Sequence, residues 1–228
     1  MRRREKCGKL KALRHFFEKY VFRRTFMLDK SLPYTPLLMI KTDTENFPKF
    51  DLPEGYSFRF YRAGDEMHWA ALECALGQFE TVEAGLRCFE NEFLVGYAIR
   101  PEDRMLFVLS PEGKYVATAA LWTGDFLGEE HQRVHWVAVS DECAGKGIAK
   151  ALLSRVIRLY NDLGFEKFLF LRTGTWNYPA IGIYKKFGFA PYLGERSPFA
   201  NIPDEGYAEK NAAAWALVDE KHKVYASK

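Results

Sequence analysis

The chain has 228 residues, of which 48% are hydrophobic and 16% are aromatic, so it can form a folded globular protein with a substantial core. No stretch approaches the roughly 18 apolar residues of a membrane-spanning helix, and the N-terminus lacks the apolar run of a secretory signal. We therefore expect a soluble, cytoplasmic protein. The four cysteines lie far apart without a Cys-x-x-Cys pair, which predicts reduced thiols rather than a zinc ribbon or a disulfide framework.

The first 26 residues form a strongly basic segment. They carry ten Lys or Arg and two Glu, a net charge of +8, whereas the remainder of the chain carries −5 of the total of +3. Apolar residues recur in it at helical spacing: Leu10, Leu13, Phe16, Phe17, Tyr20 and Val21. The pattern predicts a basic amphipathic helix, which either docks on the domain or contacts nucleic acid or membrane. The acidic remainder of the chain favours docking.

Four prolines among polar residues predict a connecting segment between residues 29 and 53, with a short strand at Leu37 to Lys41. We therefore expect residues 1–52 to hold the basic helix and this segment, and residues 53–194 to form the compact domain. Residues 195–228 would be a C-terminal extension packed on the domain, with a helix at 209–222. That helix would cover the side of the domain where an acceptor substrate binds, or it would form a contact in a homodimer.

Apolar periodicity within the domain predicts alternating strands and helices. We expect strands at 56–62, 105–109, 115–122, 134–139 and 167–173, and helices at 67–76, 81–92, 147–163 and 179–187. Pro111 and Gly113 lie in the five-residue connection between two of these strands, which predicts a hairpin. Gly164 and Gly188 end the two last helices.

The stretch from Val137 to Leu152 joins an apolar run, a glycine loop and an amphipathic run. The first turn of a helix has backbone N–H groups without intrahelical partners and partial positive charge, and glycine lets such groups approach a phosphate closely. This loop therefore predicts a phosphate site. Taken alone the signal is weak, because glycines also mark plain turns between a strand and a helix.

Two motifs together resemble the GNAT superfamily of N-acyltransferases. The loop AGKGIA at residues 144–149 is similar to its acyl-CoA signature, which reads Gln or Arg, two residues, Gly, one residue, then Gly or Ala. Gly147 and Ala149 match the last two fixed positions. The stretch NYPAIGIYKKFGF at residues 177–189 resembles the second signature, with its Asn, its Tyr and its closing Gly-Phe pair. Two motifs in the right order are far more specific than one.

The resemblance implies an α/β fold with a mixed, mostly antiparallel sheet flanked by helices. Two strands of this sheet splay apart, and the pantetheine arm of CoA lies in the gap. The resemblance covers roughly residues 53 to 192 in the order of the elements. Ala144 departs from the pattern, because the family has Gln or Arg there, but the change removes a side chain and no backbone donor.

The activity implied by the resemblance is transfer of an acetyl group from acetyl-CoA to a primary amine of a small molecule or peptide, without a metal. The alternative is a catalytically silent acyl-CoA-binding module with a regulatory role. Ala144 gives the silent module some support, whereas Tyr184 and Asn177 favour the enzyme.

The same resemblance implies roles for particular residues. Tyr184 would be the general acid for the departing thiolate, since a phenol with a pKa near 10 is protonated at neutral pH; the alternative is a ring packed in the core. Asn177 would bind the amide-bearing arm of CoA, or else cap a helix. Val137 and Val139 would pair with the arm through their backbone groups. The residues expected to bind the pyrophosphate are Gly145, Lys146, Gly147, Ile148 and Ala149.

An ammonium acceptor must lose a proton before it attacks, and His135 is the first candidate for the base. The alternation of a strand would place it on the same face as Val137 and Val139; a histidine satisfied by a neighbour is the alternative. Asp125, Glu129 and Glu130 are further candidates for the base. His131 and His135 would lie roughly 13 Å apart on a strand, so we expect no metal site.

The acceptor substrate is not identified by any motif. Aromatic residues could form its binding surface and acidic residues could attract a cationic amine, although the same residues describe an ordinary amphipathic helix pair. The aromatic residues are Trp69, Phe79, Phe89, Phe93 and Trp122, and the acidic residues are Glu80, Glu83, Glu90 and Glu92.

Overall fold

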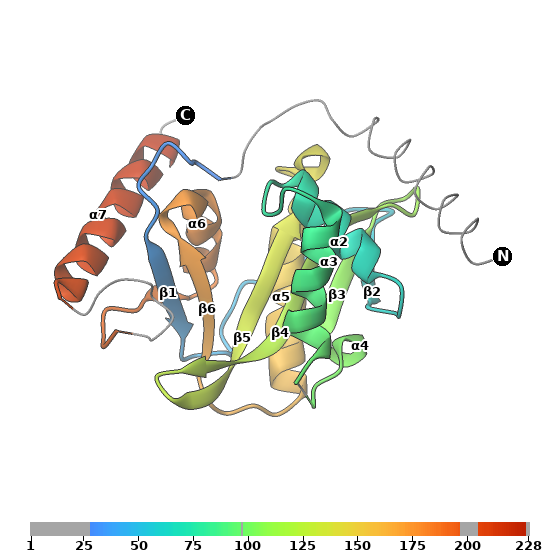
Figure 1. Ribbon diagram of the computed structural model, residues 1–228, viewed down its shortest axis with the longest axis horizontal. Coiled ribbons are helices and arrows are strands. Elements are labelled where there is room, and N and C mark those ends of the chain that lie inside the picture. The colour runs from blue at the N-terminus through green and yellow to red at the C-terminus, as the bar shows by residue number, and fades with distance from the viewer. Residues whose placement is uncertain (1–27, 97, 197–204, 227–228) are drawn as a thin grey trace.

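The computed structural model describes residues 28–96, 98–196 and 205–226 (Figure 1). The basic segment at residues 1–26 lies outside the described residues. Within them seven strands form one sheet in the order β2-β3-β4-β5-β6-β1-β7. These strands are β1 (Pro36–Lys41), β2 (Ser57–Phe60), β3 (Met105–Leu109), β4 (Tyr115–Phe126), β5 (Glu129–Val139), β6 (Leu169–Gly174) and β7 (Ala190–Pro191). Among them β5 and β6 pair in parallel and the other neighbours are antiparallel.

Helices cover both faces of the sheet (Figure 1). One face carries α2 (Glu66–Ala75), α3 (Val82–Phe89) and the short π-helix η1 (Glu90–Leu94), and the opposite face carries α5 (Ile148–Asp162). The C-terminal helix α7 (Tyr207–Ala226) packs against α6 (Tyr178–Lys186). The remaining short elements are α4 (Pro101–Arg104), η2 (Asp141–Cys143) and η3 (Thr175–Asn177). No helix of the described residues is both long enough and apolar enough to cross a membrane.

Apolar clusters on the two faces of the sheet explain why the predicted periodicities become these elements. On the face covered by α5, the strand residues Leu106, Ala119 and Leu171 pack against the apolar side of that helix. On the other face, Trp69 of α2 and Phe89 of α3 pack against β3 and β4. The predicted hairpin between β3 and β4 is confirmed, and residues of both strands belong to these clusters.

The short strand expected at 37–41 is present as β1, and it lies inside the sheet. β1 pairs with β6 from Pro36 to Lys41 and with β7 on its other edge. The sheet therefore contains residues that precede the expected start of the domain at residue 53. The apolar pattern of the sequence did not reveal that this strand lies inside the sheet. A short apolar run among prolines fits an isolated strand and a strand within a sheet equally well.

β5 and β6 diverge toward their C-terminal ends. Their pairing consists of Arg133 opposite Phe170 and Val134 opposite Leu171. Beyond this point β6 continues beside β1, and β5 continues beside β4 as far as Val139. The splayed pair of strands that the resemblance implies is confirmed, and on the side that faces β6 residues 135–139 pair with no strand of the described residues.

A β-bulge lies in β5 at the start of this divergence. Ala120 is opposite His135 and Thr118 is opposite Ala138, so β5 has one extra residue there, and Trp136 takes a φ of 47°. Such a bulge shifts the alternation of side chains by one. The expectation that His135 shares a face with Val137 and Val139 is therefore wrong: both valines face α5, whereas His135 faces α2 and α3.

Candidate active site

The loop before α5 has the geometry of an anion cradle. Gly145 and Gly147 have φ values of 77° and 84°, a left-handed conformation that favours glycine. A Cβ at either position would meet no atom of the described residues within 4 Å, so the loop borders space that these residues leave open. The first helical hydrogen bond runs from Ala151 N to Gly147 O (3.0 Å). The N–H groups of Ile148 and Ala149 precede it and form no hydrogen bond within the described part of the chain.

The two side chains at the edge of this loop differ in what they offer. Ala144, where the family has Gln or Arg, is exposed and contributes its backbone alone. Lys146 is exposed, and its Nζ donates a hydrogen bond of 3.1 Å to Tyr56 Oη. This hydrogen bond raises the pKa of Lys146 above its ordinary value, so its charge stays beside the loop at neutral pH.

The open edge of β5 continues from this loop into the gap between the splayed strands. Ser140, the residue after β5, donates from its backbone N to Val116 O of β4 (2.7 Å). Along a strand, the backbone N–H and C=O groups of successive residues point to opposite sides. The N–H and C=O of Val139 therefore point away from β4 and toward the gap. Val137 lies two residues earlier in the same unpaired part of β5. The two predicted valines are thus placed where an extended ligand could pair with backbone, as an added strand would.

Tyr184 lies in α6 with its ring packed in the core. It is 9% exposed and its ring is 6.2 Å from that of Phe189. Burial raises the pKa of Tyr184 to about 12, which keeps the phenol protonated at neutral pH. Its hydroxyl forms no hydrogen bond with the described residues. Tyr184 therefore packs its ring in the core and also keeps a hydroxyl proton that it could donate.

Asn177 is the N-cap residue of α6, the position that the alternative interpretation expects. Its backbone has φ −94° and ψ 23°, however, and its side chain forms no capping hydrogen bond. The position is therefore confirmed, but the side chain does not stabilise the first turn as a capping side chain would. The side-chain amide remains able to bind a ligand in the gap.

His135 forms a close pair with Glu92 of η1, with Nε2 and Oε2 2.7 Å apart. Burial lowers the pKa of His135 to about 4, although the hydrogen bond to Glu92 opposes this shift. The hydrogen bond from His135 holds the pKa of Glu92 below its ordinary value. The imidazole is therefore neutral at neutral pH and the carboxylate is charged. Glu92 also contacts Arg133, with Nη2 at 3.3 Å.

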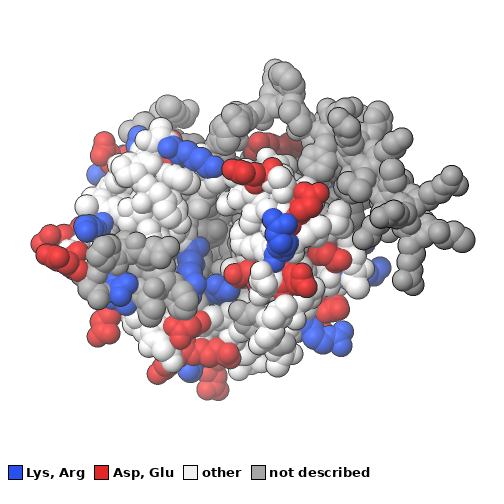
Figure 2. Space-filling view, in the orientation of Figure 1, with Lys and Arg blue, Asp and Glu red and all other residues white. Residues whose placement is uncertain are grey.

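The hollow beside this pair is basic. Figure 2 shows Lys or Arg side chains in the hollow between the part of the molecule that holds α2 and α3 and the part that holds α6 and β1. Arg133 of β5 is 6% exposed, and Arg172 of β6 donates from Nη2 to Asp125 O at 3.1 Å. The positive charges of both arginines help to lower the pKa of His135.

The other candidates for the base lie at the hairpin that joins β4 to β5. Asp125 holds the hairpin turn, where its Oδ1 accepts a hydrogen bond from Gly128 N (3.2 Å). Glu129 is 69% exposed and pairs with Lys167 at 3.2 Å, and Glu130 is exposed beside it. Five residues of strand, about 17 Å, separate Glu129 from Val134, so the structure does not bring these groups to the gap. Among the described residues no three His, Cys, Asp or Glu side chains form a group that could hold a metal.

The five aromatic residues proposed for the acceptor surface belong to one cluster on the face of α2 and α3. Trp69, Phe79, Phe89, Phe93 and Trp122 form it together with Trp136. Of the acidic residues, Glu92 reaches the interior, whereas Glu80, Glu83 and Glu90 are exposed. Sequence reasoning missed Glu73 of α2, which is buried in the same region. Its spacing of four residues from Trp69 was the available signal.

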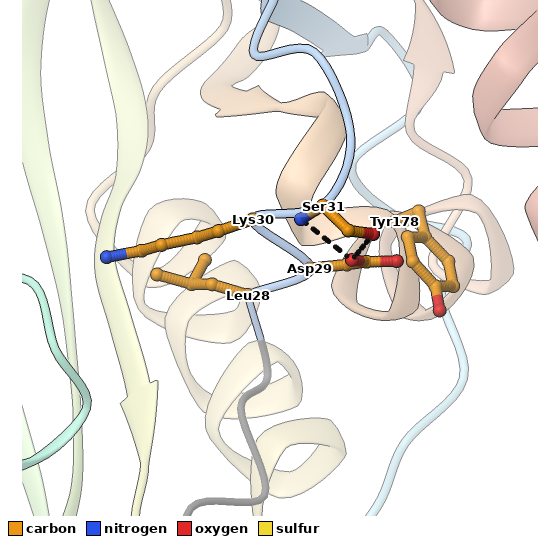
Figure 3. A pocket seen from close by; sticks show the side chains of 5 residues that line it. All are labelled: Leu28, Asp29, Lys30, Ser31 and Tyr178. Carbon is orange, nitrogen blue, oxygen red and sulfur yellow. Dashed lines mark hydrogen bonds between the residues drawn. The ribbon is translucent and has the colours of Figure 1, made fainter.

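Residues 28–32, here called the strap, cross from η3 toward α2. Asp29 N donates to Trp176 O (3.0 Å), Trp176 Nε1 donates to Leu32 O (2.7 Å), and Lys30 Nζ approaches Gly77 O (3.4 Å). In Figure 3 the side chains of Leu28 and Lys30 extend away from Tyr178, while Asp29 and Ser31 lie beside it. Leu28 to Ser31 and Tyr178 line an open depression of about 390 Å³ next to Asn177.

A sheet that forks beside a glycine loop and a helix N-terminus defines a fold suited to an acyl-CoA transferase. The sequence matches the model of the acetyltransferase (GNAT) family over residues 54–189. The chain therefore belongs to the GNAT family of acetyl-CoA-dependent acetyltransferases. A comparison with curated proteins gives no match.

Solved structures share this fold. A GCN5-related N-acetyltransferase from Sphaerobacter thermophilus is 24% identical with a TM-score of 0.54, over 70% of this chain and 49% of that one. A GNAT-family acetyltransferase from Colwellia psychrerythraea is 13% identical with a TM-score of 0.53, over 70% of this chain and 54% of that one. This chain matches about half the length of each structure. At these identities the likeness shows the fold alone.

Proposed function

We propose that the protein transfers an acetyl group from acetyl-CoA to a primary amine of a small molecule or peptide. One observation carries the proposal. The open N–H groups at the start of α5 lie at the end of the unpaired edge of β5, and α6, which holds Tyr184, follows β6, the other strand of the fork. Bound acetyl-CoA would supply an activated thioester carbonyl at this fork.

The chain's own residues supply the binding surface in three parts. The N–H groups of the loop Gly145–Ala149 would bind the pyrophosphate, and the charge of Lys146 would offset the phosphate charge. The backbone of Val137 and Val139 would bind the pantetheine arm as a further strand. The side-chain amide of Asn177 would bind the same arm from α6. Open space over both glycines of the loop supports this fit.

Tyr184 would hold the proton that the departing sulfur needs. Because burial raises its pKa to about 12, its Oη keeps the proton until negative charge builds on the leaving group. His135 stays a candidate for the base that deprotonates the acceptor. Its pKa of about 4, however, makes formation of an imidazolium unfavourable, so it would act as a weak base beside Glu92.

Release of free CoA thiol, measured against a panel of primary amines, tests this function. We expect turnover on at least one amine, and a Tyr184→Phe variant with kcat reduced about 10² to 10⁴-fold and an unchanged affinity for acetyl-CoA. Tyr160→Phe is the matched control for turnover, since Tyr160 is also a buried helical tyrosine but lies toward the end of α5 that is remote from the glycine loop. We expect it to behave as the wild type.

The catalytically silent module is the second candidate, and Ala144 is the observation that favours it, because an exposed methyl group replaces the polar side chain of the motif. Acetyl-CoA binding without turnover on any amine would support the silent module. If the Tyr184→Phe variant retains full turnover, the protein is an enzyme but Tyr184 is not its general acid.

A further inference from the structure

Phe50 is an exposed aromatic residue that the proposed function does not yet use. It lies in the segment between β1 and β2 and is 40% exposed, although phenylalanine is usually buried. It also precedes residues 54–189, which match the family model. The ring therefore belongs to a part of the chain that the family motifs do not explain.

The backbone around Phe50 is fixed to α5. Phe50 N donates a hydrogen bond of 2.9 Å to Ser154 Oγ, and this hydroxyl donates to Pro48 O at 3.1 Å. Ser154 itself is only 2% exposed. A buried hydroxyl that bonds the backbone on both sides of residue 49 holds this segment against the helix. The exposed ring is thus presented by a constrained backbone.

The Phe50 ring lies between α5 and the end of α6. Its centroid is 5.9 Å from that of Phe187, the C-cap residue of α6. The ammonium group of Lys150 lies over the Phe50 ring, 5.2 Å from its centroid. Lys150 forms no hydrogen bond or ion pair with the described residues. Its charge is therefore available to an anionic ligand beside the ring.

Lys150 and Phe50 lie on the same side of α5 as the glycine loop. Gly147, Lys150 and Ser154 follow one another at intervals of three and four residues, which places them in one row along the helix. Phe50 contacts two members of this row, Lys150 and Ser154. The row leads from the proposed pyrophosphate site to a cation and an exposed aromatic ring within about 11 Å, or two turns of helix.

We propose that Phe50 and Lys150 form the subsite for the 3′-phosphoadenosine part of acetyl-CoA. Adenine lies against the exposed part of the Phe50 ring, and the 3′-phosphate lies beside Lys150 Nζ. This assignment rests on the proposed acetyl-CoA site. In CoA one ribose carries the pyrophosphate at its 5′ position, a phosphate at its 3′ position and the adenine. The glycine loop, Lys150 and Phe50 offer matching partners in neighbouring positions along α5.

The chemistry of the two side chains suits this part of the cofactor. An aromatic ring stacks against a nucleobase, because every base has a π-face. A lysine ammonium is a compact charge that pairs with phosphate. The subsite would supply binding that the polar side chain missing at Ala144 does not give. It would also favour CoA thioesters over thioesters of phosphopantetheine, which has no adenosine.

Calorimetric titration of the full chain with CoA, 3′-dephospho-CoA and 4′-phosphopantetheine tests the subsite. Phe50→Leu should bind both nucleotides about tenfold more weakly and phosphopantetheine as the wild type does. Phe50→Tyr, which keeps an aromatic ring, should keep the wild-type affinities. Lys150→Gln should weaken CoA binding about 3- to 10-fold and leave 3′-dephospho-CoA unchanged, because only CoA carries the 3′-phosphate.

Two further variants are matched controls. Phe165 follows the other end of α5 and has the Arg104 guanidinium over its ring at 4.9 Å, so Phe165→Leu changes a similar pair away from the glycine loop. Arg158 is an exposed cation of the same helix. Phe165→Leu and Arg158→Gln should bind all three ligands as the wild type does.

The titrations separate failure of the subsite from failure of the proposed function. Wild-type affinity of Phe50→Leu for CoA would overturn the subsite alone, and so would an equal loss of affinity for CoA and phosphopantetheine. Lys150→Gln that weakens CoA and 3′-dephospho-CoA by the same factor would overturn the place of the 3′-phosphate. No binding of CoA by the wild type would overturn the proposed acetyl-CoA site, and the subsite with it.

Discussion

His135 Nε2 and Glu92 Oε2 are 2.7 Å apart, which joins the bulged strand β5 to the π-helix after α3. The pair forms because the bulge at Trp136 turns His135 toward α2 and α3, where η1 presents Glu92. The carboxylate opposes the burial that depresses the imidazole pKa. The Glu92 carboxylate therefore limits how far burial lowers the pKa of His135.

Glu92→Gln should lower the pKa of His135 below its value of about 4, because the variant removes the negative charge that favours the imidazolium. Titration of the imidazole signals by NMR would measure the shift. Glu90→Gln is the matched control, since Glu90 is in the same π-helix but exposed. A rise in the His135 pKa in Glu92→Gln would contradict the geometry of the pair.

Gly147→Ala should weaken acetyl-CoA binding at least tenfold. A Cβ at φ 84° costs roughly 1–2 kcal/mol, and it would stand in the open space where the phosphates are expected. Gly164→Ala is a close control, because Gly164 follows the other end of α5 with φ 70° and equally open space. Both variants should lose similar stability in denaturant unfolding, but Gly164→Ala should bind acetyl-CoA as the wild type does. If both variants bind acetyl-CoA with equal affinity, the loop is not part of the acetyl-CoA site.

Asn177→Ala should reduce acetyl-CoA affinity about 3- to 10-fold, the effect of one lost hydrogen bond, with little change in stability. The side chain does not cap α6, so the helix loses nothing. Thr81→Ala is the opposite case, because Thr81 Oγ1 accepts a hydrogen bond from Ala84 N at the start of α3. It should lose about 1 kcal/mol of stability at unchanged affinity. Calorimetric binding and thermal unfolding on both variants would distinguish a ligand contact from a cap.

The stability of the protein should fall as pH rises from about 6.5 to about 8. Glu73 has a pKa of about 8 in the folded protein and 4.5 as its ordinary value, so between these values the folded state holds a proton that the unfolded chain releases. The His135 pKa is lowered instead, so that residue makes stability rise between about pH 4 and pH 6.5, where it opposes the effect of Glu73.

Glu73→Gln should flatten the fall in stability between about pH 6.5 and pH 8, a difference on the order of a few kcal/mol in the free energy of unfolding. Denaturant melts of both proteins at each pH would measure it. Parallel curves for the wild type and the variant would mean that Glu73 is ionised in the fold.

The sequence predicted most of the architecture, because the features concerned are local. The hairpin between residues 105 and 122 and the helices at 147–163 and 179–187 follow from periodicity and glycine stops, and all are present with ends shifted by a few residues. The open loop at Gly145 to Ala149 likewise follows from the local order of strand, glycines and helix. β1 was harder to place, because its partner β6 lies more than a hundred residues away.

The sequence by itself determined the family, through two motifs whose spacing fixes a glycine loop and a tyrosine-bearing helix. Tertiary structure decided which side chains meet at the fork. One extra residue at Trp136 reverses the face of His135, and strand periodicity cannot reveal a bulge because it depends on pairing with β4. The unpartnered burial of Glu73 likewise depends on α3 and β5 packing around α2, since desolvation is a property of everything that surrounds a group.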